Sequence, residues 1–151
     1  MMNQFAQLIS AERQTLVLLD TCTIINAYAG KPDAVALRSR IAKRKDIRII
    51  VPRLLIREVA KVAGINQEQA LALIESFSEM GQIDYIEENE RLAREAKALS
   101  AKYPEYCHYP DNHYLVHCRN EGAVLVTYDS NLHRVADLEG VMVSTPRTFR
   151  K

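Results

Sequence analysis

Hydrophobic and polar positions along this chain follow two alternating patterns. Short aliphatic and β-branched runs, such as LVLL at residues 16–19, are typical of buried strands, whereas longer stretches with apolar residues at helical spacing are typical of amphipathic helices. Pro52 and Gly64 stand where one such helix should begin and end. We expect strands near residues 16–19, 47–51, 83–86, 123–127 and 141–143, and helices near residues 33–45, 53–63, 66–80, 89–103, 111–122 and 130–137.

This order of strands and helices predicts an α/β fold. Strands that alternate with helices are joined by right-handed crossovers, which give a mostly parallel sheet of about four to five strands with helices on both faces. With 151 residues, of which 48% are apolar, the chain fits one domain over residues 1–151 that buries a sizeable core. We expect residues 1–14 to form a polar lead before the first strand.

Cysteine content and hydropathy predict the compartment. The three cysteines, Cys22, Cys107 and Cys118, are not spaced as a disulfide framework, and the N-terminal residues lack the apolar run of a signal peptide. The longest aliphatic runs are far shorter than the roughly 20 residues that cross a bilayer. We therefore expect a cytoplasmic protein that does not span a membrane.

Four acidic residues, hereafter the four acids, stand where a strand pattern ends or on a helix that follows one: Asp20, Glu58, Asp111 and Asp129. The carboxyl ends of parallel strands share one edge of the sheet, so the first and last of these residues should meet there. Glu58 shares or borders the apolar stripe of its helix, and Asp111 opens a helix on the side of its apolar positions. The pattern predicts one acidic pocket.

Each of the four acids also has an ordinary structural explanation. Asp111 suits a helix N-cap, and Asp20 and Asp129 suit a strand end, a turn or a cap. Glu58 could pair with Lys61 at i,i+3 spacing, which is worth only a few tenths of a kcal/mol. The combination of four convergent positions carries the argument, rather than any one residue.

Convergent carboxylates need a cation. At a separation of about 4 Å two unit charges cost roughly 4 kcal/mol at an effective dielectric of 20, so several together must protonate or bind a divalent ion. Oxygen ligands without histidine or cysteine favour Mg²⁺ or Mn²⁺ over zinc. Phosphodiester hydrolysis is the matching chemistry, since one ion activates water and a second stabilises the leaving oxygen.

The net charge of +1 conceals two segments of opposite sign. Residues 38–61 carry nine basic and two acidic side chains, a net charge of +7, and residues 66–90 carry seven acids and no Lys or Arg. Such asymmetry can put a basic surface beside the acidic pocket, as a phosphate-backbone substrate needs. Ordinary solvated helix faces explain it equally well.

At these residues the chain resembles the PIN-domain nucleases, which include the VapC-type toxin ribonucleases and related archaeal and bacterial proteins. The opening strand with the first aspartate is LLDTCTIINAY, the glutamate segment is VPRLLIREVAK, and the third acid, its helix and a Thr-x-Asp strand end lie in HYPDNHYLVHCRNEGAVLVTYDSNL. The resemblance extends over roughly residues 16–146. It implies a three-layer α/β/α fold and an Mg²⁺- or Mn²⁺-dependent endoribonuclease centre at the four acids.

The resemblance also implies roles for further residues and for partners. Thr127 would support the pocket through its hydroxyl, and Asn26 would orient Asp20 or the substrate. Asn131 stands where many members of the family carry another acid, which leaves open whether one or two ions bind. Arg53 or Arg57 would contact RNA phosphates. Toxin-type relatives imply a homodimer that is inhibited by an antitoxin, whose basic side chain enters the pocket.

Other interpretations remain open. A non-catalytic PIN-like module would bind RNA or protein and use its acids as caps, and a haloacid dehalogenase-type phosphatase would need an aspartate where Cys22 stands. Catalysis by Cys22 is disfavoured because no histidine is nearby in sequence and its apolar neighbours suggest a core position. A zinc site is disfavoured because His113 and His117 project nearly opposite to Asp111 and Cys118, which predicts surface histidines and a buried Cys118. That zinc set would comprise Cys107, His108, His113, His117 and Cys118.

Overall fold

The computed structural model describes residues 14–151, so the expected lead lies almost wholly outside the described residues. Its five strands form one sheet in the order β3-β2-β1-β4-β5, and every neighbouring pair is parallel. The predicted parallel sheet is confirmed. The strands are β1 (Thr15–Leu19), β2 (Ile47–Pro52), β3 (Ile83–Ile86), β4 (Val124–Val126) and β5 (Val143–Ser144).

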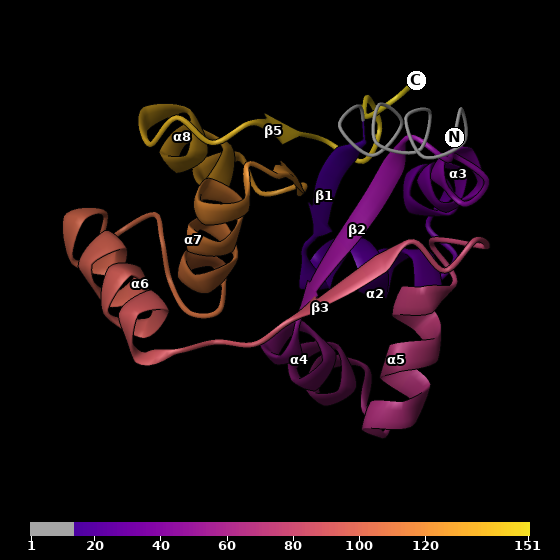
Figure 1. Cartoon of the computed structure of the whole chain (residues 1–151), viewed down its shortest axis with the longest axis horizontal. Helices are drawn as coiled ribbons and strands as arrows, with labels where there is room; N and C mark the ends of the chain where they lie inside the picture. Colours follow the sequence, from indigo (N-terminus) through magenta and orange to yellow (C-terminus); the bar gives the residue numbers. More distant parts are fainter. Residues whose placement is uncertain (1–13) are drawn as a thin grey trace, which may run out of the picture.

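Helices cover both faces of this sheet. The chain steps from β1 through β2 to β3, then returns to the other side of β1 for β4 and β5, so right-handed crossovers put the helices before β3 on one face and the helices after β3 on the other. Figure 1 shows α3, α4 and α5 on one side of the strands and α6, α7 and α8 on the other. The three-layer α/β architecture is therefore confirmed. The helices are α2 (Thr21–Tyr28), α3 (Pro32–Ile41), α4 (Arg53–Ala63), α5 (Gln67–Glu75), α6 (Glu90–Lys102), α7 (Asp111–Glu121) and α8 (Ser130–Leu138).

The central strand β1 fixes the register at the carboxyl edge of the sheet. Its last three residues, including Leu18 and Leu19, are fully buried between the helical layers. Leu19 is aligned with Val126 on β4, and the Asp20 amide donates to the Val126 carbonyl over 3.2 Å. The residues that follow β1 and β4 therefore emerge side by side.

Helix α2 was not among the expected elements, and α3 ends at Ile41 rather than near residue 45. Two further elements differ from the sequence prediction for a tertiary reason. Helix α5 ends at Glu75 rather than near residue 80, because the following turn buries Phe77 in the core and the Glu79 amide bonds to the Ala42 carbonyl. Strand β5 begins at Val143 rather than at residue 141, because the Val141 amide bonds back to the end of α8. Both differences arise from tertiary contacts that local periodicity does not encode. Among residues 14–151, no helix is both long enough and apolar enough to cross a bilayer.

A buried hydrogen bond joins the starts of α2 and α7. The hydroxyls of Thr21 and Tyr114 are 2.7 Å apart, and both side chains are buried. We expect Tyr114→Phe to lower the free energy of unfolding by about 1–2 kcal/mol, because the Thr21 hydroxyl loses its partner. Thr21→Val should cost a similar amount, and the double variant should cost clearly less than the sum of the two. Urea denaturation of the four proteins measures this, and strict additivity would contradict a direct bond.

Candidate functional site

Asp20 is a buried carboxylate held by three hydroxyl and amide donors. It follows β1, caps the N-terminus of α2, and is 3% exposed. Its Oδ1 accepts from the Thr23 amide over 2.9 Å and from the Thr23 hydroxyl over 2.7 Å. Its Oδ2 accepts from the hydroxyl of Thr127. These donors fix the orientation of the carboxylate.

Asp129 is connected to Asp20 through hydrogen bonds to Thr127. The Asp129 amide donates to the Thr127 hydroxyl oxygen over 3.1 Å, so this buried hydroxyl links the two acidic residues. Oδ1 of Asp129 caps α8 by accepting from the amides of Asn131 at 2.9 Å and Leu132 at 3.3 Å. The cap interpretation therefore describes both Asp20 and Asp129.

Asp111 is placed differently. It is the first residue of α7, but Pro110 occupies the cap position and no side chain caps this helix, so the N-cap interpretation of Asp111 is wrong. Within residues 14–151 its carboxylate takes part in no hydrogen bond or ion pair, although it is partly buried. The Tyr114–Thr21 bond, one turn further along, holds this end of α7 against the start of α2.

Glu58 lies on α4, partly buried, and makes no ion pair with Lys61 among the described residues, so that expected pair does not form. It is close enough to influence Asp111. Burial, followed by the charges of Asp20, Asp129 and Glu58, raises the pKa of Asp111 to about 7. The structure thus brings the four acids within electrostatic reach of one another.

The environment of Asp20 contains opposing effects. Burial is the largest and raises its pKa, while the hydrogen bonds from Thr127 and Thr23 lower it, and the charge of Asp129 raises it again. Among residues 14–151, no Lys or Arg forms an ion pair with any of the four acids. The four acids therefore carry negative charge that no basic side chain of the described residues neutralises by an ion pair.

This donor set suits a hard divalent cation. Its ligand atoms are carboxylate oxygens, and Mg²⁺ typically uses one or two protein carboxylates together with water. Within residues 14–151, no three His, Cys, Asp or Glu side chains already stand together as a set that could hold a metal ion. A cation here would thus be bound by a subset of the four acids with water completing its shell.

The other predicted site residues lie around this pocket in different ways. The Asn26 side chain makes no hydrogen bond to Asp20 among the described residues. Asn131 donates its backbone amide to the Asp129 carboxylate that caps α8. Arg53 is exposed and pairs with Glu87 over 2.7 Å. Arg57 is exposed and its charge acts on Tyr109. The pKa of Tyr109 is raised, mainly by burial and also by the charge of Glu58, and Arg57 opposes this rise.

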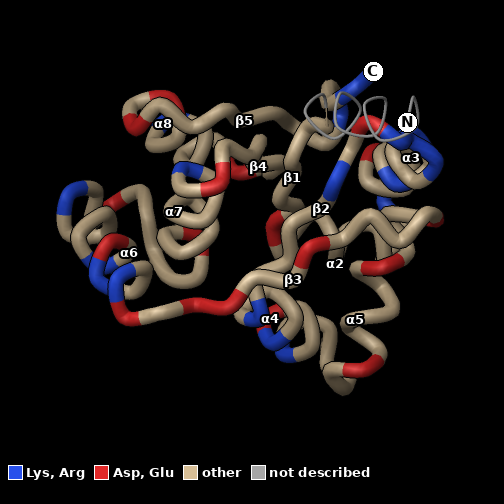
Figure 2. Tube along the Cα trace, viewed as in Figure 1, with Lys and Arg blue, Asp and Glu red and all other residues tan. Residues whose placement is uncertain are grey.

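The expected basic surface beside the pocket is divided in the fold. Strand β2 runs through the basic segment, so its residues before β2 lie at the amino end of the sheet and those on α4 at the carboxyl end. Figure 2 shows the basic residues of α3 near the chain termini, away from α4. Only the α4 part, with Arg53, Arg57 and Lys61, is on the helix that carries Glu58.

Several predicted side-chain environments were wrong. His117 is 1% exposed rather than on the surface, because α7 packs against both the sheet and α6. Glu88 accepts from both histidines, with Oε1 lying 3.1 Å from His113 Nδ1 and 3.3 Å from His117 Nε2, and burial lowers the pKa of His117. Cys22 is exposed rather than in the core, whereas Cys118 is buried as expected.

Sequence reasoning named Thr127 but missed Thr23, Thr21 and Tyr114. Thr23 makes two hydrogen bonds to Asp20, and a threonine three positions after a capping aspartate is a signal that could have identified it. Thr21 and Tyr114 are far apart in sequence, and nothing local predicts their bond.

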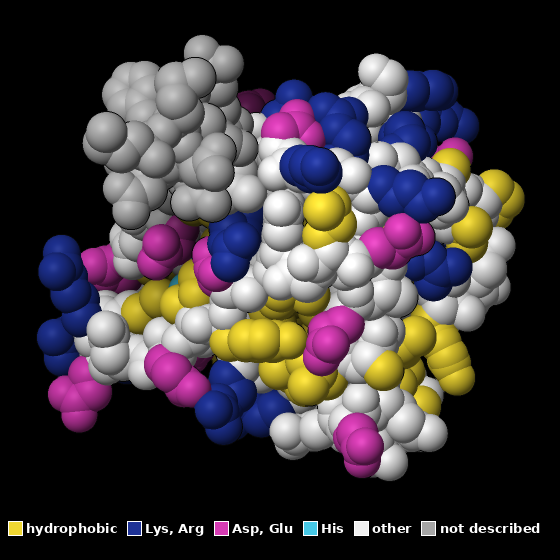
Figure 3. All heavy atoms as spheres, turned by 45° about the vertical axis from the view of Figure 1, so that its right-hand side comes forward, with side chains coloured by type: hydrophobic (Ala, Val, Ile, Leu, Met, Phe, Trp, Pro, Cys, Tyr) yellow, Lys and Arg dark blue, Asp and Glu magenta, His cyan; other side chains and the backbone are white. Residues whose placement is uncertain are grey.

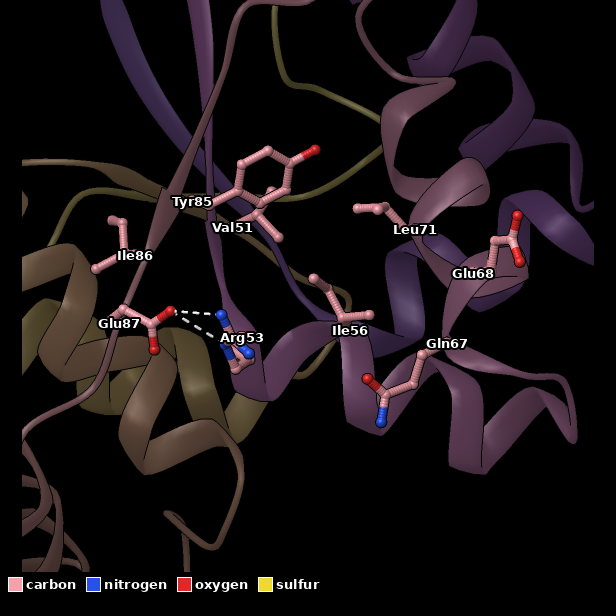
Figure 4. Close-up of a pocket in the computed structure, with 9 residues that line it drawn as sticks. All are labelled: Val51, Arg53, Ile56, Gln67, Glu68, Leu71, Tyr85, Ile86 and Glu87. Carbon is pink, nitrogen blue, oxygen red and sulfur yellow. Dashed lines mark hydrogen bonds and ion pairs between the residues drawn. The ribbon is translucent and has the colours of Figure 1, made fainter.

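A separate groove of about 430 Å³ lies between β3, α4 and α5. Figure 4 shows its apolar wall, with Val51, Ile56 and Tyr85, and the Arg53–Glu87 ion pair at its edge. None of the four acids lines it, so it is distinct from the acidic pocket.

Comparison with known proteins identifies the family. Residues 17–138 match the PIN domain family, and this chain belongs to it. Membership agrees with the resemblance found in the sequence and removes the basis for the dehalogenase-type interpretation. No curated protein matches the chain.

Solved structures share the fold. The chain is similar to one in the structure of VapBC2 from Rickettsia felis bound to a promoter DNA fragment, with a TM-score of 0.63 and 16% identity over 87% of this chain and 98% of that one. VapBC-1 from nontypeable Haemophilus influenzae gives a TM-score of 0.62 and 20% identity over 87% and 98%. A toxin–antitoxin complex from Klebsiella pneumoniae gives 0.56 and 24% over 86% and 97%. At these identities the likeness concerns the fold.

The raised pKa of Asp111 makes stability depend on pH. Its pKa is about 7 in the folded protein and about 3.9 in an unfolded chain, so the folded state holds the proton more tightly and loses stability as pH rises from about 4 to 7. We expect Asp111→Asn to raise the free energy of unfolding at pH 8 by about 2–4 kcal/mol without divalent ions, and by much less near pH 4.5.

Urea denaturation at pH 4.5, 6 and 8 measures this difference. Asp137→Asn, which changes an exposed acid on α8, is the matched control and should alter stability by less than about 0.5 kcal/mol at each pH. A difference between Asp111→Asn and the native protein that stays constant with pH would contradict the expectation.

Proposed function

We propose that this protein is an Mg²⁺- or Mn²⁺-dependent endoribonuclease that hydrolyses RNA phosphodiester bonds at the four acids. The observation that carries the proposal is the gathering of carboxylates at one edge of the sheet. The Thr127 hydroxyl joins Asp20 to the Asp129 backbone, and burial with three neighbouring carboxylates raises the pKa of Asp111 to about 7. A site with that much unneutralised negative charge attracts a divalent cation. Membership in the PIN-domain family supports the same conclusion.

In this proposal Asp20, Asp111 and Asp129 hold the metal, and Glu58 helps position the metal or the attacking water. A bound Mg²⁺ or Mn²⁺ ion would lower the pKa of a water molecule and stabilise negative charge on the phosphate. Because Asn131 replaces a further acid, a single ion is the simpler assignment, with a second arriving with RNA.

The remaining side chains prepare this chemistry. Thr127 and Thr23 hold the Asp20 carboxylate in one orientation, and Thr127 also fixes the Asp129 backbone. Arg57, which has no ion-pair partner among the described residues, is suited to contact an RNA phosphate, and Arg53 would do so after release from Glu87. Asn26 and Asn131 would bind substrate or water at the margin of the pocket.

One observation favours a second candidate function. Asp20 and Asp129 do cap helices, as a non-catalytic PIN-like module that binds RNA or protein would require. Capping leaves the Asp111 charge unexplained, since that carboxylate caps nothing. We therefore favour the enzyme.

We further propose that the protein is the toxin of a toxin–antitoxin pair and acts in the cytoplasm as a homodimer. The similar folds in VapBC complexes, and in the toxin–antitoxin complex from Klebsiella pneumoniae, support this assignment. An antitoxin would inhibit the site by inserting a basic side chain among the four acids, where no Lys or Arg pairs with them in the described residues.

Cleavage of a mixed single-stranded RNA pool tests the enzyme. We expect cleavage with Mg²⁺ or Mn²⁺, none with a chelator, and none by Asp20→Asn. Thr127→Val should lose about 10–100-fold in metal affinity or activity, because it removes an outer-shell donor from Asp20. Asp137→Asn should cleave like the native protein. Equal cleavage by Asp20→Asn and the native chain would refute the proposal.

Expression in a bacterial host tests the toxin role. We expect the native chain to arrest growth and Asp20→Asn to be tolerated at the same protein level, because arrest requires RNA cleavage. Arrest that persists in the Asp20→Asn variant would assign toxicity to something other than the four acids.

A further inference from the structure

Seven basic side chains gather at the amino end of the sheet, and we call them the basic pole. Contacts join the three segments that supply them, which are α3, the loop before β2 and residues 145–151. Arg40 Nη2 donates to the carbonyls of Pro146 at 2.8 Å and Phe149 at 3.1 Å, and Arg150 bonds to Thr15. The basic pole comprises Arg38, Arg40, Lys43, Arg44, Lys45, Arg150 and Lys151.

Acidic side chains neutralise only part of the basic pole. Asp46 pairs with Arg44 at 2.7 Å. The bond from Arg44 and the nearby charge of Arg150 lower the pKa of Asp46. In the described part of the chain the other members have no acidic partner, and Figure 3 shows Lys and Arg side chains gathered over the α3 side of the surface.

Local roles account for only some of these charges. Arg38 and Arg40 lie in the last turn of α3, where cations interact favourably with the helix dipole. Lys43 and Lys45 are exposed beyond that helix, where no such interaction acts. Like charges at this density repel unless an anionic partner covers them.

The basic pole is separate from the acidic pocket. The Thr15 amide bonds to the Asp46 carbonyl over 2.7 Å at the start of β1, while Asp20 follows the end of this strand. At about 3.3 Å per residue, the length of the strand puts roughly 16 Å between them. The pole therefore cannot serve as counter-charge for the four acids.

We propose that the basic pole binds the phosphate backbone of RNA, at nucleotides outside those that meet the four acids. This inference rests on the proposed function, because it takes the RNA substrate as the polyanion. Lys and Arg side chains bind phosphates as sequence-independent charges, so the pole supplies affinity without specifying sequence. It would thereby hold long RNA near the acids.

The test measures binding without cleavage. In an Asp20→Asn background with a chelator present, the affinity for a fluorescent unstructured 20-nucleotide RNA is followed by anisotropy over a salt series. We expect Lys43→Gln/Lys45→Gln to bind about tenfold more weakly, with the salt slope of log affinity shallower by about 1.4, which is about 0.7 for each lost phosphate contact. Arg94→Gln/Lys97→Gln on α6 removes the same charge elsewhere and should stay within about twofold of the parent.

The outcomes separate this inference from the proposed function. Equal RNA affinity of both double variants, at unchanged thermal stability, would contradict RNA binding by the basic pole and would leave the proposed cleavage at the four acids unaffected. If the Lys43→Gln/Lys45→Gln variant binds RNA more weakly but the native protein cleaves no RNA, the basic pole is supported as an RNA-binding surface and the nuclease proposal is contradicted. Polyglutamate that competes as well as RNA would assign the surface to an acidic protein and overturn the RNA partner. With active protein, the pole variant should raise KM for the 20-nucleotide RNA but not for a trinucleotide.

Discussion

Repulsion among carboxylates at one edge of a parallel sheet is the constraint on which the site depends. The register of β1 and β4 brings Asp20 and Asp129 together whatever their chemistry, because both follow strands that end at the same level. Two of the resulting charges accept hydrogen bonds from backbone amides at helix N-termini. Asp111 receives no such donor, and its pKa rises to about 7. Asp111, at the start of α7, is therefore a carboxylate without a hydrogen-bond donor among the described residues.

Capping and metal binding need not compete for the same oxygen. Asp129 uses Oδ1 for both amides of its cap, and its Oδ2 has no partner among residues 14–151. Each carboxylate oxygen carries two acceptor sites. Oδ1 of Asp20 accepts from two donors and Oδ2 from one, so one site remains on Oδ2. The helix caps thus orient the carboxylates, and orientation is what a cation site requires.

The sequence predicted elements well where a local pattern decided them. β3 lies at the expected residues 83–86 because its short apolar run has turn residues on both sides. The end of α5 was missed because burial of Phe77, a tertiary contact, terminates the helix. The positions of Asp20 and Asp129 followed from strand ends. Thr127, which was expected to act through its hydroxyl, bonds to Asp20 from just after β4, whereas the bonds from Thr23 were not predicted.

Side-chain environments were harder to predict because one helix can have two buried faces. The expected angle between His117 and Asp111 around α7 does not by itself determine exposure. Helix α6 covers the face of α7 that was expected to meet solvent, and Glu88 bonds to His117 there. Cys22 was expected in the core from its apolar neighbours, yet it is exposed near the start of α2. Sequence periodicity predicts which way a side chain points around a helix, whereas tertiary packing determines whether it meets solvent or another element.

The two charged segments of the sequence neutralise each other where they become neighbours. β2 and β3 are adjacent parallel strands, so Arg48 pairs with Asp84 at 2.8 Å and Arg53 pairs with Glu87 at 2.7 Å. These pairs use the middle of the basic segment and the last part of the acidic segment. Basic residues before β2 remain at the amino end of the sheet, and the carboxylates after β1 and β4 remain at the carboxyl end. A molecule with a net charge of +1 is therefore electrically polar along its strands.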